Sequence, residues 1–579
     1  MSDIDLSSPG GPRLQPHRRS ASRLAILAAG WGPKMQGFRW QPEPRFPGSA
    51  VRGRQLLAGN FRLGGALVEA HGKSPWDITP PTDAFAQALH GFDWIDDLAA
   101  IPGGLGRATA QAWLADWITR YGRGKGVGWS PDLTGRRQIR WISQVLFLMN
   151  GQDPAQTRAF EACLSRQANY IAKRWDRSSV GLPRFEALTG LVYSACSLIG
   201  METHLGPALG NLARECATQI DSHGGIPTRN PEELLEVFVL LTWVAQILQE
   251  TGKRPDPAID TAILRIAPTL RALRHADGSL VRAHGGGRGA PGRLIGALVQ
   301  SGVRPSRIKG LAMGFARLAA GRVTVIADAA PPQMGSASAH AGTLGFEMTS
   351  ANHPLIVHAG SGTAFGPDWR RAGRATVSHS TVSLAGYSSS RFAEKAIQAA
   401  PDLQGFAEGP TDVSIQNSEI AGGEGIIISH DGWRRTHGLV HLRALTLEDN
   451  GNLLRGDDGL AALDGNDRTR FETVNRALPY DVGLQFAVRF HLHPDVIAEV
   501  DMGGAAISLT LPNEETWVFR HGSEAEVEIR ASVYFDAGRL KPRATKQIVL
   551  SSRVRGYGAA VSWSIARPSA LLSGSDLPL

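Results

Sequence analysis

The chain has 579 residues, of which 42% are hydrophobic and 20% charged, and its formal net charge is +8 at pH 7. This length allows two or more domains with full cores, and the composition excludes a chain that is disordered throughout. The excess of 61 Lys and Arg over 53 Asp and Glu fits an anionic ligand, but no RNA- or DNA-binding signature accompanies it, so nucleic acid is not expected as a partner.

The first 22 residues are rich in Pro, Gly, Ser and charge, and we expect them to form a disordered tail. Within this region Arg18 and Arg19 precede a short apolar run at residues 24–29. The run is weak as a signal peptide and too short to cross a bilayer. No later stretch has the length and apolar character of a transmembrane segment.

Residues 23–320 are expected to form a helical domain. Eight segments carry apolar residues at three- and four-residue spacing, which is typical of amphipathic helices. They are residues 84–89, 108–121, 136–149, 157–174, 185–198, 205–220, 232–249 and 259–273. Short joins between them predict antiparallel hairpins, which can build a bundle, a solenoid or a closed ring.

Residues 321–579 are expected to form a β-domain. Short runs alternate polar and apolar residues, with Gly, Asp, Asn and Pro between them. They are residues 322–327, 343–348, 355–358, 376–384, 425–429, 440–447, 485–492, 506–511, 516–520, 525–534 and 545–551. So many strands without intervening helices indicate antiparallel sheets stacked as a sandwich, and a cleft between the two domains is the natural ligand site.

One stretch, residues 340–387, concentrates side chains that can carry chemistry. It holds three histidines and three arginines, namely His340, His358, His379, Arg370, Arg371 and Arg374. Short apolar runs separate them, so neighbouring strands can gather imidazoles and guanidinium groups on one wall. Any chemistry is expected there.

Four segments together resemble the heparinase II/III-like family of polysaccharide lyases. They are WSPDLTGRRQIRW (129–141), HAGTLGF (340–346), PLIVHAG (354–360) and RATVSHSTV (374–382). The resemblance implies an α+β multidomain fold, in which an incomplete (α/α) toroid of helical hairpins is followed by an antiparallel β-sandwich, with an anionic polysaccharide held in a groove between them. It also implies a cell-envelope or periplasmic location, whereas the poor signal segment leaves a cytoplasmic location open.

The chain departs from the family pattern at three places. The Asn-His pair that family members carry at the start of a toroid helix is missing from LPRFE (182–186), and their Tyr-His pair is replaced in TRNPEELL (228–235). Their His-x-His-Ala-Asp pattern reads SAHAG at residues 338–342, which keeps only the second histidine. The standard lyase mechanism therefore does not carry over directly.

The resemblance nevertheless implies a zinc ion, with His340, His358 and His379 at the matching ligand positions. Three neutral imidazoles suit a four-coordinate zinc site. The alternative is that these residues are core-edge histidines hydrogen-bonded to the backbone. No other cofactor is indicated.

Candidate catalytic residues remain in both halves. Arg229 could neutralise a uronate carboxylate and Glu233 could act as the base, although Asn230-Pro231 with following acids equally predicts a capped helix start. Arg374 could bind a carboxylate bidentately. Tyr387 is the nearest tyrosine to the histidines and is the candidate acid, with simple packing as its alternative.

Candidate substrate-binding residues are aromatic or basic. They are Trp129, Arg136, Arg140, Trp141 and Arg370. Aromatic faces beside guanidinium groups can stack on a charged sugar and pair with it, but tryptophans in toroid helices are more often part of the core.

Two functions follow from the sequence. The first is a polysaccharide lyase that cleaves a uronic-acid-containing anionic glycan by β-elimination. The second is a non-catalytic glycan-binding or cell-envelope protein that retains the lyase scaffold.

Overall fold

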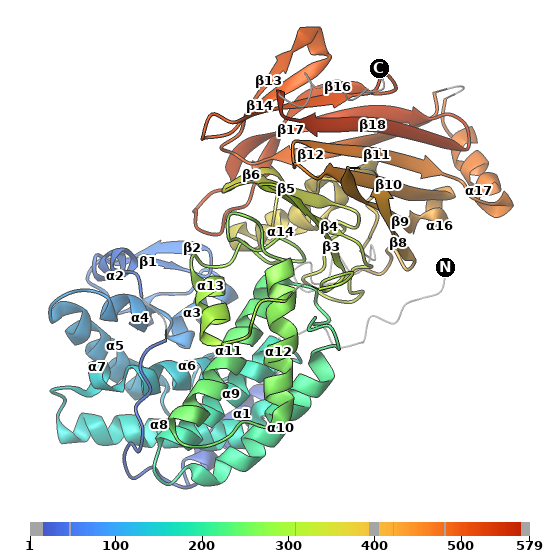
Figure 1. The fold of residues 1–579 in the computed structure, drawn as a ribbon. Helices are drawn as coiled ribbons and strands as arrows, with labels where there is room; N and C mark the ends of the chain where they lie inside the picture. Colours follow the sequence, from blue (N-terminus) through green and yellow to red (C-terminus); the bar gives the residue numbers. More distant parts are fainter. Residues whose placement is uncertain are drawn as a thin grey trace.

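The computed structural model describes residues 16–45, 48–306, 308–392, 405–420, 422–479 and 482–568. A helical half is followed along the chain by a half made of antiparallel sheets, and the two pack against each other (Figure 1). The predicted order of a helical domain and a β-sandwich is therefore confirmed.

The helical half holds thirteen α-helices and one short hairpin in its described residues. The helices are α1 (Pro16–Ala29), α2 (Ala50–Leu57), α3 (Asp83–Gly91), α4 (Trp94–Ala99), α5 (Leu105–Tyr121), α6 (Pro131–Ser143), α7 (Val145–Met149), α8 (Pro154–Arg174), α9 (Leu182–Ser197), α10 (Leu205–Gln219), α11 (Pro231–Glu250), α12 (Pro257–Ala272) and α13 (Arg293–Gln300). The hairpin pairs β1 (Asn60–Leu63) with β2 (Ala66–Glu69). Within the described part of the chain, no helix is both long and apolar enough to cross a membrane.

Local sequence signals explain where several helices begin. The Asp153 side chain accepts hydrogen bonds from the first turn of α8, and Gln156 bonds back to the Asp153 N–H, which completes a capping box. Pro231 and Pro257 occupy the first helical position of α11 and α12, where a missing N–H costs nothing. The predicted tail is shorter than expected, because α1 already begins at Pro16; residues 1–15 lie outside the described residues.

Two glycines let α6 and α9 approach closely. A Cβ on Gly190 would lie 2.5 Å from the Cα of Gly135, and one on Gly135 would lie 2.2 Å from the Glu186 carbonyl oxygen. Any larger residue would force these helices apart. The segment expected as one helix at 136–149 is interrupted at Gln144, which separates α6 from α7.

The second half contains two sheets stacked as a sandwich, with helices between some of the strands. Its strands are β3 (Phe315–Ala320), β4 (Val323–Asp328), β5 (Phe346–Ser350), β6 (His353–Val357), β7 (Val382–Leu384), β8 (Val413–Ile420), β9 (Gly423–Trp433), β10 (Leu439–Glu448), β11 (Leu453–Ala461), β12 (Leu484–Leu492), β13 (Ile497–Asp501), β14 (Ala506–Thr510), β15 (Thr516–His521), β16 (Glu526–Tyr534), β17 (Arg543–Val554) and β18 (Gly558–Ala566). Among the described residues, the α-helices between them are α14 (Pro367–Arg374), α16 (Arg434–His437) and α17 (Gly465–Arg476).

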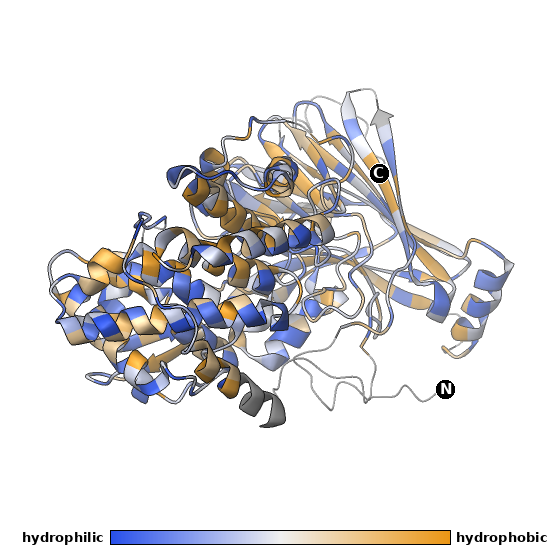
Figure 2. Ribbon diagram, turned by 90° about the horizontal axis from the view of Figure 1, so that it is seen from below, coloured by the Kyte–Doolittle hydropathy of each residue, from blue (hydrophilic) through white to orange (hydrophobic). Residues whose placement is uncertain are grey.

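The two sheets are antiparallel and share one core. One runs in the order β16-β17-β12-β6-β5-β4-β3, with β7 beside β12, and the other in the order β13-β14-β15-β18-β11-β10-β9-β8. Hydrophobic and hydrophilic residues alternate along many of the strands (Figure 2), as expected where one face packs inward. Phe346 of β5 stacks on Trp563 of β18 at a centroid distance of 5.6 Å, which joins the sheets.

Two strand predictions need correction. The strand expected at 376–384 is confined to β7, because Thr376–Ser378 forms a 3-10 turn and the Thr376 hydroxyl donates to the Ala341 carbonyl. β3 lies inside the region assigned to the helical domain, so the sandwich begins at Phe315 rather than at residue 321. Its alanine-rich sequence, FARLAA, does not by itself distinguish a strand from a helix.

A fully buried ion pair lies between the sheets. Arg443 of β10 is opposite Asp458 of β11 in the strand register, and neither side chain is exposed. Arg443 donates to both carboxylate oxygens at 2.8 and 3.0 Å, and its third nitrogen donates to the Leu344 and Ser380 carbonyls at 2.7 and 2.9 Å. One side chain thus ties the loops of the first sheet to the second.

We expect Arg443→Met to lower the free energy of unfolding by about 3–5 kcal/mol, because it leaves the Asp458 carboxylate buried without its cation. Urea denaturation followed by circular dichroism measures this. The matched control is Arg476→Met, which breaks the ion pair between Arg476 and Glu472. The Arg476 side chain is 78% exposed, so this substitution should lower the free energy of unfolding by less than about 1 kcal/mol. Equal losses in the two variants would contradict the structural role of Arg443.

Candidate functional site

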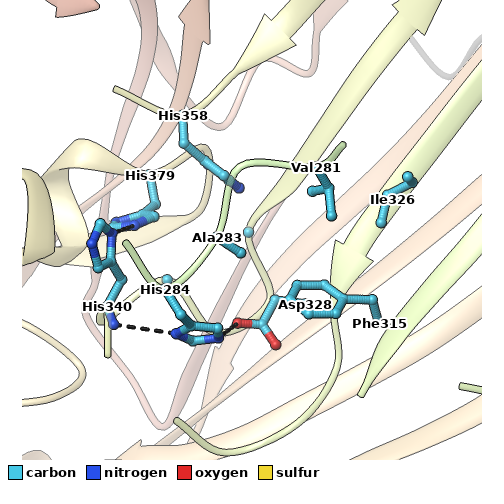
Figure 3. Close-up of a pocket in the computed structure, with 11 residues that line it drawn as sticks. Val281, Ala283, His284, Phe315, Ile326, Asp328, His340, His358 and His379 are labelled. Atoms are coloured by element: carbon cyan, nitrogen blue, oxygen red, sulfur yellow. Dashed lines mark hydrogen bonds and ion pairs between the residues drawn. The ribbon is translucent and has the colours of Figure 1, made fainter. Parts of the chain in front are cut away.

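A small cavity lies at the junction of the two halves (Figure 3). Polar side chains line one part of it and apolar side chains the other. They are His284, Asp328, His340, His358 and His379, with Val281, Ala283, Phe315 and Ile326. The structure therefore brings together the three predicted histidines and adds one histidine and one aspartate.

Backbone contacts of the sandwich position these imidazoles. His358 directly follows β6, and His379 follows the 3-10 turn Thr376–Ser378. Ser380 links the two: its N–H donates to His358 Nδ1 at 3.1 Å and its hydroxyl donates to the Val357 carbonyl at 2.7 Å. Since the Ser380 carbonyl also accepts from buried Arg443, the cavity wall rests on the core of the sandwich.

Hydrogen-bond partners assign the proton on each neutral ring. His379 Nδ1 faces the Ala375 carbonyl at 2.9 Å and must donate, so its Nε2 accepts from His340 Nδ1 at 3.2 Å. His284 Nδ1 accepts from the His340 backbone N–H, which places the His284 proton on Nε2, 3.4 Å from Asp328. His358 Nδ1 accepts from Ser380, so its Nε2 carries the proton.

Burial keeps these rings neutral. It lowers the pKa of His379 to about 4 and the pKa values of His340 and His358 well below the usual value. Burial alone would raise the pKa of Asp328, but the Arg229 guanidinium holds it well below its usual range. At neutral pH the cluster therefore combines uncharged imidazoles with one arginine–aspartate pair.

The predicted zinc ligands fit only in part. His340 Nδ1 and His379 Nε2 are 3.2 Å apart, a separation that two ligands about 2.0–2.1 Å from one ion can have, but here a proton on His340 Nδ1 lies between them. His358 does not fit, since the Ser380 N–H occupies its Nδ1 and puts the proton on Nε2. Across the described ranges no group of three or more His, Cys, Asp or Glu side chains is arranged to hold a metal ion, and zinc binding by the three histidines stays a prediction.

Arg229 joins the two halves through its guanidinium group. Its five N–H groups donate to the carbonyls of Met313, Gly314, Ala330 and Pro331 and to the Asp328 carboxylate. Its guanidinium also lies 4.8 Å from the Phe315 ring centroid. Every donor is used within the protein, so none is left for a substrate carboxylate in this arrangement, and the neutralising role of Arg229 stays a prediction.

The segment after Arg229 forms the predicted helix start. Asn230 accepts hydrogen bonds from the N–H groups of Glu232 and Glu233, with Pro231 at the first helical position. Glu233 accepts from the Thr228 hydroxyl at 2.8 Å, and burial raises its pKa. The capping alternative is thus confirmed, whereas the role of Glu233 as a base stays a prediction.

The arginines of α14 hold the loop that carries His340. Arg374 is 2% exposed, and its guanidinium donates to the carbonyls of Ala339 and Ser336. Arg370 donates to the Ala337 carbonyl at 2.9 Å. Arg374 thus acts as a structural clamp, and its burial conflicts with the predicted contact with substrate.

Tyr387 is not among the residues that line the cavity. It is 48% exposed, and its ring packs edge-on against His437 at 4.5 Å. Packing, the alternative to the acid role, is what the structure shows.

The predicted sugar-stacking tryptophans are buried. Trp129 is 4% exposed and Trp141 is not exposed at all. With Trp117 they surround Arg137, whose guanidinium lies 4.3 Å from the Trp117 ring and donates to the His90 and Gly128 carbonyls. The predicted stacking is wrong, because the alternation of aromatic and basic residues builds a cation–π cage inside the helical half.

Arg136 and Arg140 are paired with carboxylates of the helical half. Arg136 donates to Glu186 at 2.5 Å, and burial raises the pKa of Glu186 to about 7. Arg140 lies 2.9 Å from Asp93 and lines a separate small pocket beside Tyr193. Their role in substrate binding stays a prediction.

The sequence analysis did not identify two of the residues that line the cavity. Asp328 ends the buried strand β4, and a charged residue at that position was a usable signal. His284 precedes the glycine triplet 285–287 and has a left-handed φ of 47°. Both residues come near Arg229 only through the packing of the two halves.

We expect stability to fall between about pH 6.5 and pH 4. Below pH 6.5 a histidine in the unfolded chain becomes protonated, whereas buried His379 stays neutral until about pH 4. The contribution of neutral His379 to the free energy of unfolding is therefore complete above pH 6.5 and is lost on acidification, by on the order of 3 kcal/mol. Urea denaturation from pH 7.5 to 4.5 should give a shallower loss for His379→Asn. The exposed His223→Asn control should follow the wild type, and identical slopes for all three proteins would refute the assignment.

Comparison with known proteins gives one matching family model and one relative with substantial sequence identity. A family model described as heparinase II/III-like, C-terminal, matches residues 303–564. The chain is 32% identical over 548 residues to the FtsZ-localized protein C of Caulobacter vibrioides, across 92% of this chain and 91% of that protein.

Solved structures share the fold at low sequence identity. Heparinase III superimposes with a TM-score of 0.67 at 12% identity, over 95% of this chain and 90% of that chain. A mutant of the heparan sulfate lyase HepC from Pedobacter heparinus gives a TM-score of 0.57 at 13% identity, over 95% and 89% of the two chains. These matches confirm the predicted toroid followed by a β-sandwich, and the chain belongs to the heparinase II/III-like family.

Proposed function

We propose that this chain is a binding protein built on the lyase scaffold, and that it localises to FtsZ-containing assemblies without performing β-elimination. The observation that carries the proposal is the hydrogen bonding of Arg229. This residue was expected to neutralise a substrate carboxylate, but all five of its guanidinium N–H groups donate to acceptors of its own chain.

The other requirements of β-elimination point the same way. The reaction needs a base and an acid within hydrogen-bond reach of the sugar, and a preorganised group for the developing charge. Tyr387 packs on His437, and Glu233 is hydrogen-bonded to Thr228. The junction histidines are at most 5% exposed, so a polysaccharide chain cannot reach them without a rearrangement.

The relative from Caulobacter vibrioides supports FtsZ as the proposed partner. The name of that relative places it with FtsZ, and the 32% identity extends over 92% of this chain. Such coverage includes both halves, so we propose the same localisation for this chain. An anionic polysaccharide stays a second proposed ligand, on the strength of the lyase fold.

The lyase function is the second candidate, and one observation favours it. His340 Nε2 keeps a lone pair and His358 Nε2 keeps a proton, and no described residue hydrogen-bonds to either atom. An acceptor and a donor lining one cavity are what proton transfer to and from a substrate would use. If β-elimination occurs, these two atoms are its proposed acid–base pair.

We expect no lyase activity. Purified protein incubated with heparan sulfate, chondroitin sulfate, hyaluronan or alginate should release no unsaturated uronate, measured by ultraviolet absorbance, with heparinase III as the positive control. The matched variant is His340→Gln, which removes the free ring nitrogen. An absorbing product from the wild type that this variant fails to make would replace our proposal with the lyase function.

We expect the chain to co-sediment with FtsZ polymers. Purified Caulobacter vibrioides FtsZ assembled with GTP should carry the protein into the pellet, whereas FtsZ kept unassembled with GDP should not. Densitometry of pellet and supernatant measures the bound fraction. Absence from the pellet, both at low salt and at physiological salt, would contradict the proposed partner.

A further inference from the structure

A segment between α1 and α2 crosses the ends of two neighbouring helices, α9 and α11 (Figure 1). We call this segment, residues 36–45, the strap. Phe38 pairs with Leu198, the residue directly after α9, in a short antiparallel bridge. The Trp40 ring N–H donates to Glu250, the last residue of α11, at 3.2 Å. The strap therefore lies on the helical half, against the C-terminal ends of α9 and α11.

Arg45 anchors the end of the strap. Its Nε donates to the Tyr193 hydroxyl at 3.1 Å. Its two terminal nitrogens donate to the side chains of Gln246 and Glu250, both at 2.8 Å. Gln246 and Glu250 share one face of α11, and the negative end of the helix dipole adds to the Glu250 charge. These acceptors, together with the nearby Trp243 ring, form what we call the α9/α11 pocket, which suits a planar cation and repels an anionic sugar.

The sequence before Arg45 favours an extended chain. Pro42 and Pro44 alternate with Gln41 and Glu43, and a residue that precedes proline is disfavoured in the helical region of φ and ψ. Residues 41–44 accordingly adopt neither helix nor strand. Pro42 is buried and Pro44 is exposed. Extended proline-rich segments of this kind are preorganised, so they bind aromatic-lined sites with little loss of conformational entropy.

A small cavity remains beneath the strap. Pro44 and Arg45 line it together with Trp243 and other residues of the helical half. Its volume of about 20 Å³ is enough for a water molecule. None of its lining residues also lines the cavity of Figure 3. The strap thus covers the α9/α11 pocket without filling it, whereas the side chains of a protein core are close-packed.

We propose that the α9/α11 pocket is a docking site for an arginine-bearing, proline-rich segment of another polypeptide, and that the strap occupies this site in cis. The contacts of Arg45 and Pro44 show the chemistry that the site accepts. Tethering gives the strap an effective concentration in the millimolar range, so a partner segment binds once the strap has left or by supplying more contacts. A second copy is disfavoured as the occupant, because exchanging identical straps adds no contact.

Binding of a labelled peptide to the full chain tests this proposal. The probe is fluorescein-labelled QPEPRFPG, the sequence of residues 41–48, and fluorescence anisotropy measures its dissociation constant. Pro44→Gly/Arg45→Gly removes the cis competitor without changing the chain length. We expect this variant to bind the peptide at least about tenfold more tightly than the wild type. Adding Glu250→Gln to the variant, or replacing the arginine of the peptide with glutamine, should abolish the gain, because the ion pair is lost.

The matched control is Glu43→Gly, which places a glycine in the strap at an exposed position but keeps Arg45, and it should bind the peptide like the wild type. Arg45→Lys keeps the charge but not the planar fork. It should also gain affinity, even if thermal unfolding shows that the glycine variant does not fold. No gain in either variant, or a gain that Glu250→Gln leaves unchanged, would overturn the proposal. A wild-type dimer that Pro44→Gly/Arg45→Gly abolishes, detected by light scattering, would overturn it in favour of strap exchange between two copies.

Discussion

The two halves are held in register by one buried guanidinium. Arg229 comes two residues before the first residue of α11, so its backbone belongs to the helical half. Its acceptors belong to the segment that enters the sandwich, to the end of β4 and to the residues after β4. A planar fork with five directed donors tolerates little rotation of one half against the other. Local capping by Asn230 and the long-range contacts of Arg229 thus meet in two consecutive residues.

Backbone strain accumulates around this contact. Arg229, His284, Met313 and Leu344 all have left-handed φ values between 47° and 65°, although none is glycine. Such conformations persist only where the surrounding structure fixes them. Two groups fix these conformations here. Asp328 contacts both Arg229 and His284, and the buried Arg443 donates a hydrogen bond to the Leu344 carbonyl.

The same contacts explain how a lyase fold can serve binding. In this chain the polar groups of the junction satisfy one another, so the cavity is small and its imidazoles are neutral. What remains available lies on the surface, where Leu24 and Leu27 of α1 and the following Trp31 are exposed. The toroid and the sandwich then act as a rigid frame that presents such surfaces.

The sequence by itself determined the helical half, the sandwich, the start of α11 and the meeting of three histidines, because hydrophobic period, capping residues and the family segments are local signals. It did not determine which charged and aromatic residues face a ligand. Trp129 and Trp141 could form a sugar platform or belong to the core of the toroid, and the segment at Arg229 could neutralise a carboxylate or begin a helix. Only the tertiary structure decided these cases, because burial and hydrogen-bond partners depend on residues as much as 102 positions away in the chain.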